Sequence, residues 1–321
     1  MSILDAKKKI FAVIAVLCIL MLSVGCTKSE PKELVIADQF GLAYAPIEIL
    51  KATTILEDSL KAHGVENVEV IFERMGNTTA IREAMLSENL DVGFMAIPPF
   101  LLGVEKGMDW KIISGVSESP VALIGEIGIE SVGEINSNHR IILPQLGSVQ
   151  HILLAMAADE KMGNWAAFNE QVLAMSHPDG YTAILADPEN YLHFTTPPYM
   201  ESELQDGRLG VVTNGEEIFG EPFTFIVSVC QERFYKDENL YKAFKEALSE
   251  AIDYIHEYPE ETRVILNAAY DYPEDMIDAI LNDPQMVFST EVKGMDKFMS
   301  YMQKMDLLKS DDMVTLSWDE E

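Results

Sequence analysis

The chain has 321 residues, of which 48% are hydrophobic and 24% are charged, as is typical of folded globular proteins. Its formal net charge is −30, from 23 Lys+Arg against 53 Asp+Glu, and so acidic a surface repels phosphate backbones and anionic lipid headgroups. The length predicts about two domains. Composition and charge argue against a disordered chain and against a nucleic-acid-binding protein.

The N-terminus has the layout of a secretory signal. A basic segment, Lys7-Lys8-Lys9, precedes an apolar run over 10–24, which is shorter than the roughly 20 residues that span a bilayer as a helix. The segment Leu22-Ser23-Val24-Gly25-Cys26 resembles a bacterial lipobox, in which the cysteine is lipidated and becomes the mature N-terminus. We therefore predict a lipoprotein signal peptide over 1–25 and a lipid-anchored tether over 26–33. The alternative is an ordinary signal peptide with an incidental cysteine.

Cysteine and histidine patterns disfavour metal and disulfide chemistry. Cys230 is the only cysteine after Cys26, so no intrachain disulfide forms in the body of the chain, and we expect a buried thiol there. The six histidines form no His-Glu-x-x-His motif or close pair. We expect neither a metal nor a cofactor, although a metal site assembled from distant residues stays open.

Strands and helices alternate along the first part of the chain. Apolar runs predict strands at 34–37, 68–72, 91–95 and 111–115. Apolar spacing predicts one helix with Ile49, Thr53, Leu56 and Leu60 on one face, ended by Gly64, and a second helix over 78–89. This alternation is typical of an α/β fold with largely parallel sheets.

The alternation continues in the second part. Strands are predicted at 140–143, 171–175, 191–195 and 224–230. Between the first two, Ser148 is the expected N-cap of a helix that Gly163 ends. Apolar residues from Leu240 to Ile255 form an inward stripe of a further helix that ends near Pro259.

One pattern recurs at a constant offset. Pro98-Pro99-Phe100 and Pro197-Pro198-Tyr199 each follow a predicted helix, an acidic turn and a strand, and they lie 99 residues apart. We interpret the two copies as equivalent parts of two α/β lobes. Because ligands of open α/β sheets bind beyond the carboxyl ends of strands, two such ends facing each other form a cleft. Phe100 and Tyr199 are then expected to approach a ligand from opposite sides, unless each ring packs within its own lobe.

Three loops between a strand and a helix are candidate binding segments. They are 39–46, 76–79 and 147–151, and helices that start there leave N–H groups free for a ligand. Alternatively, Pro46 only opens a helix, Asn77 only caps one, and His151 lies at a helix start without touching a ligand. Signatures of enzymes are absent: the sequence has no Gly-x-Ser-x-Gly, no Walker loop and no Gly-x-Gly-x-x-Gly.

In this order the loops resemble one family. The segments 41–46, 76–78 and 90–95, the two Pro-Pro pairs, and Pro144 with Gly147-Ser148 and His151 resemble the substrate-binding lipoproteins of ABC importers for nitrate, sulfonates, taurine and thiamine-pyrimidine precursors. The resemblance covers about residues 33–265. It departs at Thr195-Thr196-Pro197-Pro198-Tyr199, where the family often has a Trp-Glu-Pro-Tyr-like segment. A related enzyme branch uses a cysteine-rich motif, which one body cysteine does not supply.

The resemblance implies a two-lobed (type II) periplasmic-binding-protein fold, each lobe a mostly parallel sheet flanked by helices, with a ligand cleft between the lobes. Lobe I is expected over 34–116 and 223–321, and lobe II over 117–222. The implied function is the extracytoplasmic, membrane-anchored component of an ABC importer, a monomer that delivers a small molecule to its permease by hinge closure. The expected ligand-binding residues are Gln39, Phe40, Tyr44, Asn77, Thr78, Pro99, Phe100, Ser148, Gln150, His151, Thr196 and Tyr199.

The ligand follows less directly from the sequence. Aromatic walls with neutral polar groups and no lysine or arginine favour a flat heterocycle such as a pyrimidine, whereas a nitrate or sulfonate-type anion would depend on helix N-termini alone. Two other functions stay open, an extracytoplasmic enzyme on the same scaffold and a sensor lipoprotein.

Overall fold

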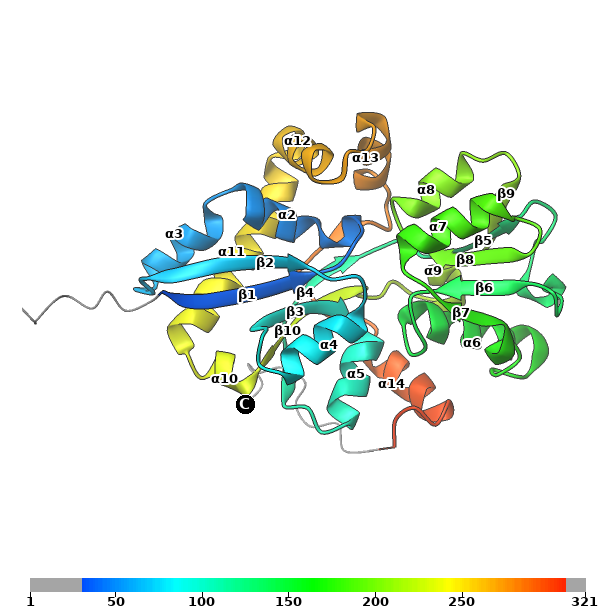
Figure 1. Ribbon diagram of the computed structural model, residues 1–321, viewed down its shortest axis with the longest axis horizontal. Coiled ribbons are helices and arrows are strands. Elements are labelled where there is room, and N and C mark those ends of the chain that lie inside the picture. The colour runs from blue at the N-terminus through cyan, green and yellow to red at the C-terminus, as the bar shows by residue number, and fades with distance from the viewer. Residues whose placement is uncertain (1–30, 310–321) are drawn as a thin grey trace, which may run out of the picture.

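The computed structural model describes residues 31–309, which form two β-sheets with helices on both faces of each (Figure 1). The first sheet has six strands in the order β11-β4-β10-β3-β1-β2, and the second has five in the order β7-β6-β8-β5-β9. The strands of the first sheet are β1 (Lys32–Asp38), β2 (Val68–Arg74), β3 (Val92–Ala96), β4 (Trp110–Glu118), β10 (Ile226–Gln231) and β11 (Val287–Phe288). Those of the second are β5 (Ala122–Glu126), β6 (Arg140–Leu143), β7 (Val172–Ala174), β8 (Tyr191–Thr195) and β9 (Leu209–Asn214).

Most strands of each sheet run in one direction, as the sequence predicts. In the first sheet β1 pairs in parallel with β2 and β3, while β10 is antiparallel to both β3 and β4, and β11 is antiparallel to β4. In the second sheet β6 pairs in parallel with β7 and β8, and β5 alone is antiparallel to its neighbours β8 and β9. The fold class is therefore the expected two-lobed α/β architecture.

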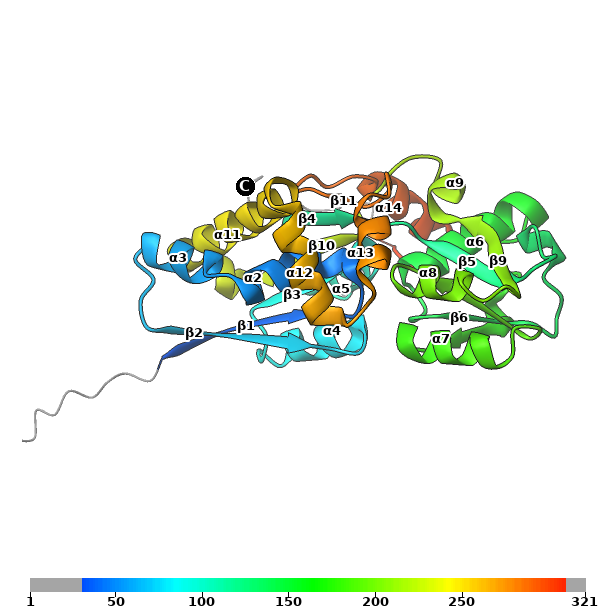
Figure 2. The same ribbon diagram turned by 90° about the horizontal axis from the view of Figure 1, so that it is seen from above.

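Helices enclose both sheets. On the first sheet α2 and α3 lie with α11 on one face, and α4 and α5 lie on the other; on the second, α7 and α8 lie opposite α6 and α9 (Figures 1 and 2). Their bounds are η1 (Leu42–Tyr44), α2 (Ala45–Ala52), α3 (Ile55–Ala62), α4 (Thr78–Leu86), α5 (Ile97–Glu105), η2 (Val132–Glu134), α6 (Val149–Met162), η3 (Asn169–Gln171), α7 (His177–Ala186), α8 (Tyr199–Leu204), α9 (Gly215–Phe219), α10 (Glu232–Tyr235), α11 (Glu238–Glu257), α12 (Pro259–Tyr270), α13 (Glu274–Leu281) and α14 (Met295–Lys304). None of the helices within 31–309 combines the length and the apolar character that crossing a membrane requires.

The best-marked helices are confirmed. Ser148 caps α6 by accepting a hydrogen bond from the His151 N–H, and Gly163 ends the helix in the left-handed conformation at φ 66°. The predicted stripe of α11 is buried. One prediction is wrong: the helix expected through Ile49 and Leu60 is two helices, because Thr53 takes an extended conformation (φ −120°, ψ 177°) and its hydroxyl bonds the carbonyl of Ile49. The helix expected over 78–89 ends at Leu86, and Glu88 beyond it has a φ of 58°.

The chain passes between the sheets at two places. It leaves the first sheet after Glu118 and enters the second at Ala122, and it returns between Asn214 and Ile226. Helix α14 lies across this junction, because it packs against α5 of the first lobe and α6 of the second (Figure 1). Phe298 of α14 meets the rings of Phe219 and Phe223 at centroid distances of 4.6 and 5.4 Å. The expected lobe boundaries remain a prediction about which bodies move separately.

The repeat at offset 99 corresponds to equivalent structure. Helix α4 begins at Thr78 and α7 at His177, while strand β3 begins at Val92 and β8 at Tyr191, so both pairs are displaced by 99 (177 − 78 and 191 − 92). Each helix leads into a strand that pairs in parallel with a neighbour, β3 with β1 and β8 with β6. The N-termini of α4 and α7 therefore hold corresponding places in the two lobes.

Candidate functional site

A cavity lies where the carboxyl ends of strands from the two sheets face each other. It is lined from the first lobe by residues that follow β1, β2 and β3, and from the second by residues that follow β6, β7 and β8. The space between the lining atoms is about 620 Å³, including the part open to solvent. The lining residues are Gln39, Phe40, Gly41, Ala43, Tyr44, Gly76, Thr78, Ala96, Pro99, Pro144, Gln145, Ser148, Gln150, Ser176, His177, Thr196, Phe225 and Ile226. A cavity in this place is where open α/β sheets bind ligands.

Three helices begin at the cavity wall. Helix α4 starts there at Thr78, α6 at Val149 and α7 at His177. In each helix a side chain just before the first turn, Asn77, Ser148 or Ser176, accepts one backbone N–H, while the earlier N–H groups have no acceptor within the helix. Helix N-termini carry a partial positive charge, so the three together favour an anionic group in the cavity.

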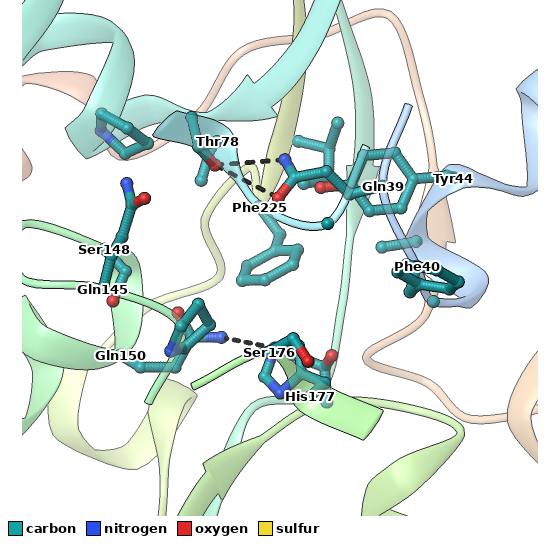
Figure 3. A pocket seen from close by; sticks show the side chains of 18 residues that line it. Gln39, Phe40, Tyr44, Thr78, Gln145, Ser148, Gln150, Ser176, His177 and Phe225 are labelled. Atoms are coloured by element: carbon teal, nitrogen blue, oxygen red, sulfur yellow. Dashed lines mark hydrogen bonds between the residues drawn. The ribbon is translucent and has the colours of Figure 1, made fainter. Parts of the chain in front are cut away.

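The lining residues among 31–309 include no lysine, arginine, aspartate or glutamate. Polar contacts hold one wall in place: the Gln39 amide donates to Thr78 Oγ1 at 3.1 Å and to the Phe94 carbonyl at 3.3 Å. On the opposite wall Gln150 Nε2 lies 3.4 Å from His177 Nε2 (Figure 3). The cavity thus offers amides, hydroxyls and one imidazole between aromatic and proline surfaces.

A charge cluster lies behind the aromatic ring at the edge of the cavity. Arg74 donates to Asp38 at 3.0 Å and to Glu48, and its guanidinium lies 5.8 Å from the ring centre of Phe40. Lys51 bonds the same two carboxylates at 2.9 and 3.0 Å. The two cations and two carboxylates compensate each other, so we infer that the cluster supports Phe40 rather than giving the cavity a net charge.

The two lobes touch at both rims of the cavity. On one rim the Leu42 N–H donates to the Pro197 carbonyl at 3.4 Å. On the other, Thr79 Oγ1 donates to Gln145 Oε1 at 2.9 Å. Gly147 lies so close to Leu102 of α5 that a Cβ atom there would come within 2.4 Å of its Cδ1. The cavity is therefore bounded by contacts between the lobes as well as by each lobe's own loops.

The structure brings eight of the predicted binding residues to the cavity. They are Gln39, Phe40, Tyr44, Thr78, Pro99, Ser148, Gln150 and Thr196. Burial of Tyr44 raises the pKa of its phenol far above the ordinary value, with Asp38 adding to the effect, so it stays a neutral hydroxyl.

Four predicted residues lie elsewhere, each for a local reason. Asn77 is exposed and caps α4, with its Oδ1 accepting the Ala80 N–H at 3.0 Å. His151 is buried in the first turn of α6, where its Nδ1 accepts the Gly147 N–H at 3.1 Å. Phe100 is fully buried in the first lobe, because α5 starts at Ile97 and turns Pro99 to the cavity instead. Tyr199 lies behind the wall, stacked on His177 with ring centres 5.8 Å apart.

Sequence reasoning missed His177 and Ser176. A signal for them exists: Ser176 is followed by Pro178 and Asp179, which is a helix-start pattern, and Ser176 indeed caps α7 by accepting the Asp179 N–H. The repeat also pairs His177 with Thr78. Gln145 and Phe225 also line the cavity without belonging to any motif, and Pro144, which belongs to the segment that carries the family resemblance, lines it although it is not among the expected binding residues.

The predictions about metal sites and cysteines can be compared with the structure only within residues 31–309. Among the described residues, no group of three or more His, Cys, Asp or Glu side chains is placed to hold a metal ion. Cys230 is buried in β10, as expected. The signal peptide and Cys26 lie outside the described residues.

The chain matches no protein-family model and no curated protein by sequence. Its structure is similar to solved ones. The alkanesulfonate-binding protein SsuA of Xanthomonas axonopodis pv. citri, bound to MOPS, has a TM-score of 0.72 at 17% identity, with 90% of this chain and 97% of that chain covered. The aliphatic sulphonate-binding SsuA of Escherichia coli gives 0.70 at 17% identity, covering 90% and 98%. The nitrate-binding protein NrtA of Synechocystis PCC 6803 gives 0.66 at 13%, covering 88% and 83%. At these identities the comparison shows the fold, which is that of periplasmic binding proteins.

Proposed function

We propose that this chain is the extracytoplasmic solute-binding component of an ABC importer and that it captures a small organic molecule with an oxyanion group, such as an alkanesulfonate. The observation that carries the proposal is the cavity between the lobes, where three helix N-termini meet uncharged polar side chains. The similar structures are those of sulfonate-binding and nitrate-binding proteins, and they support the same ligand class.

The ligand proposal differs from the heterocycle that the sequence favours. A pyrimidine fits the aromatic surfaces of Phe40 and Tyr44, but it leaves the N–H groups of the three first turns with little to bind. An alkanesulfonate places its oxygens on those groups and its alkyl chain against the aromatic and proline surfaces. Hinge closure, delivery to a permease and a monomeric state complete the proposal.

A thermal-shift panel tests the ligand class. At 100 times its dissociation constant a ligand stabilises the native state by about 2.7 kcal/mol, because it binds only the folded form. We expect alkanesulfonates to raise the melting temperature, and nitrate and pyrimidines to raise it less. A panel in which only pyrimidines act would contradict the oxyanion proposal. Turnover of any stabilising compound, followed by mass spectrometry, would identify an enzyme instead of a binding protein.

The membrane anchor is proposed from the sequence of the N-terminus. We expect Cys26→Ser to abolish fatty-acid labelling and to move the protein from the membrane to the soluble fraction, because the thiol is the acylated group. Cys18→Ser is the matched control and should keep the label. Equal labelling of the Cys26 variant and the wild type would show that no lipid is attached at this cysteine.

A further inference from the structure

A buried row of polar side chains runs from the cavity wall into the second lobe. His177 Nδ1 lies 3.1 Å from His193 Nε2, and His193 Nδ1 lies 2.6 Å from Glu203 Oε1. The side chains of His193 and Glu203 are completely buried. At the cavity end, His177 Nε2 lies 3.4 Å from Gln150 Nε2 (Figure 3). Three elements, α7, β8 and α8, thus place one carboxyl group and two imidazoles in line with the cavity.

The surrounding structure makes room for this row. Gly180 lies one turn along α7 from His177, and a Cβ atom there would come within 2.6 Å of His193 Nε2. The ring of Tyr199 covers the face of His177 at an interplanar angle of 20°. Thr195 Oγ1 lies 3.3 Å from His177 Nδ1. Each ring nitrogen of His177 and His193 has a polar neighbour within 3.4 Å, and so has Glu203 Oε1, whereas Glu203 Oε2 is buried without a partner. Buried polar groups are retained where they are hydrogen-bonded, so the row is a connected network.

The direction of its hydrogen bonds follows from proton counting. If Glu203 is protonated, its O–H donates to His193 Nδ1, and His193 carries its own proton on Nε2 and donates to His177 Nδ1. If the Glu203 proton moves to His193 Nδ1, the His193 imidazolium donates to the Glu203 carboxylate and to His177 Nδ1. The hydrogen bond between His193 and His177 then has the same direction as before. In both cases His177 Nδ1 is an acceptor, so the His177 proton is on Nε2, which faces Gln150 and the cavity.

We propose that Glu203, acting through His193, holds His177 as an N–H donor toward the cavity and so selects ligands that present a hydrogen-bond acceptor to this wall. This inference adds a determinant of specificity to the proposed function, and the ligand class that it assumes rests on that proposed function. Glu203 is a positioning residue that does not touch the ligand. In the structure Gln150 Nε2 faces His177 Nε2 at 3.4 Å, and two N–H donors do not bond to each other. The proposed His177 proton therefore requires the carboxamide to turn over, so that its oxygen accepts from His177 and its two N–H donors point to the ligand.

Burial keeps this row neutral. It raises the pKa of Glu203 to about 9 and lowers that of His193 to about 3, and burial together with His193 lowers the pKa of His177. Glu201 on the same helix has a pKa of about 7, raised chiefly by burial, so it titrates before Glu203. Ionisable groups on the elements packed against α8 include Asp179 and Tyr181 of α7, Glu126 of β5 and Tyr191 of β8. Asp283 adds to the raised pKa of Glu201, and Tyr272 is hydrogen-bonded to Tyr199.

The sign of the pH dependence follows. With a pKa raised by burial to about 9, Glu203 is expected to be protonated at pH 7.5 and mostly ionised at pH 10. The carboxylate then accepts from His193 Nδ1, His193 Nε2 becomes an acceptor, and His177 turns from a donor at the cavity into an acceptor. We expect the affinity for ethanesulfonate to fall about 10-fold between pH 7.5 and pH 10 in the wild type.

Glu203→Gln is the decisive variant. Its amide N–H₂ still donates to His193 Nδ1 but does not ionise, so we expect wild-type affinity at pH 7.5 and no fall toward pH 10. Glu203→Leu removes the donor, and we expect an affinity loss of about 10-fold at pH 7.5. A Gln variant that retains the pH step, or that is as weak as the Leu variant, would overturn the proposal.

A second measurement needs no ligand. Long-range ¹H–¹⁵N NMR of the wild-type protein at pH 7.5 should show both His177 and His193 protonated on Nε2, with the tautomer of His193 changing near pH 9. His177 protonated on Nδ1 at pH 7.5 would overturn the proposal. If ethanesulfonate fails to bind while the tautomers are as expected, the ligand class fails and the donor arrangement stands.

Discussion

Ser148→Asp should weaken the binding of an alkanesulfonate about 100-fold or more. Ser148 lines the cavity and caps α6, so a carboxylate there would lie beside an oxyanion bound as we propose. Two like charges about 5 Å apart repel by roughly 3 kcal/mol at the effective dielectric constant of partly buried protein sites. A carboxylate at this position is also attracted by the helix N-terminus, and it competes for the N–H groups that the ligand uses.

The matched control is Ser148→Asn, which has the shape of aspartate without the charge. Aspartate, asparagine and serine are comparable N-caps, so all three proteins should unfold at similar denaturant concentrations. Calorimetry with ethanesulfonate then isolates the effect of charge. Equal affinities of the Asp and Asn variants would show that no anionic group lies near α6, whereas tighter binding of a pyrimidine to both would revive the heterocycle hypothesis.

Gly115→Ala should lower the free energy of unfolding by about 3 kcal/mol. A Cβ atom on Gly115 of β4 would lie 2.1 Å from the carbonyl oxygen of Glu291, which is backbone and cannot rotate away. The neighbouring chain is fixed as well, since Gly115 N–H donates to the Thr290 carbonyl at 2.9 Å and Thr224 Oγ1 donates to the Glu291 carbonyl at 3.2 Å. Relief therefore requires the backbone at Thr290 and Glu291 to move away from β4 against these hydrogen bonds.

Gly207→Ala is the control for this variant. A Cβ atom added to Gly207 would meet no other atom within 4 Å, and the residue has no positive φ, so alanine there should leave stability unchanged or raise it by about 0.5 kcal/mol. Urea unfolding followed by circular dichroism compares the two. If Gly115→Ala unfolds at the same urea concentration as Gly207→Ala, the approach of Glu291 to β4 is looser than the structure places it.

The sequence predicts elements well where local signals agree. Ser148 and Gly163 mark both ends of α6, and its apolar residues fill the space between. At Thr53 the apolar spacing runs on without interruption, so nothing in the pattern indicates the break between α2 and α3. Strands β5 and β9, over 122–126 and 209–214, are not among the predicted strands. The spacing of apolar residues indicates which side chains are buried, but it does not indicate where the backbone leaves the helical conformation, as it does at Thr53.

Part of the candidate site could also be predicted from the sequence, and part could not. Loops that follow predicted strands could be assigned to the cavity, because the carboxyl ends of parallel strands share one edge. Which side chains of a helix face the cavity depends on the residue at which the helix starts. The sequence predicts both Pro99 and Phe100 at the cavity, but with α5 starting at Ile97 only Pro99 lines it. The sequence marks His177 as the start of a helix, but nothing in it links His177 to His193 and Glu203, since these residues lie 10 and 16 positions apart on three elements that only the packing brings together.

The direction of β1 has a practical consequence for immobilising this protein. The strand enters the first sheet at Lys32 and leads to Gln39 at the cavity, so its seven residues place about 23 Å between its start and the cavity. In Figure 1 the strand starts at the end of the molecule remote from the second lobe. A surface or fluorophore coupled ahead of Lys32 would leave the mouth of the cavity accessible. A biosensor should therefore be attached at the N-terminus, with its reporter on the rim near Thr79 and Gln145, where the two lobes meet.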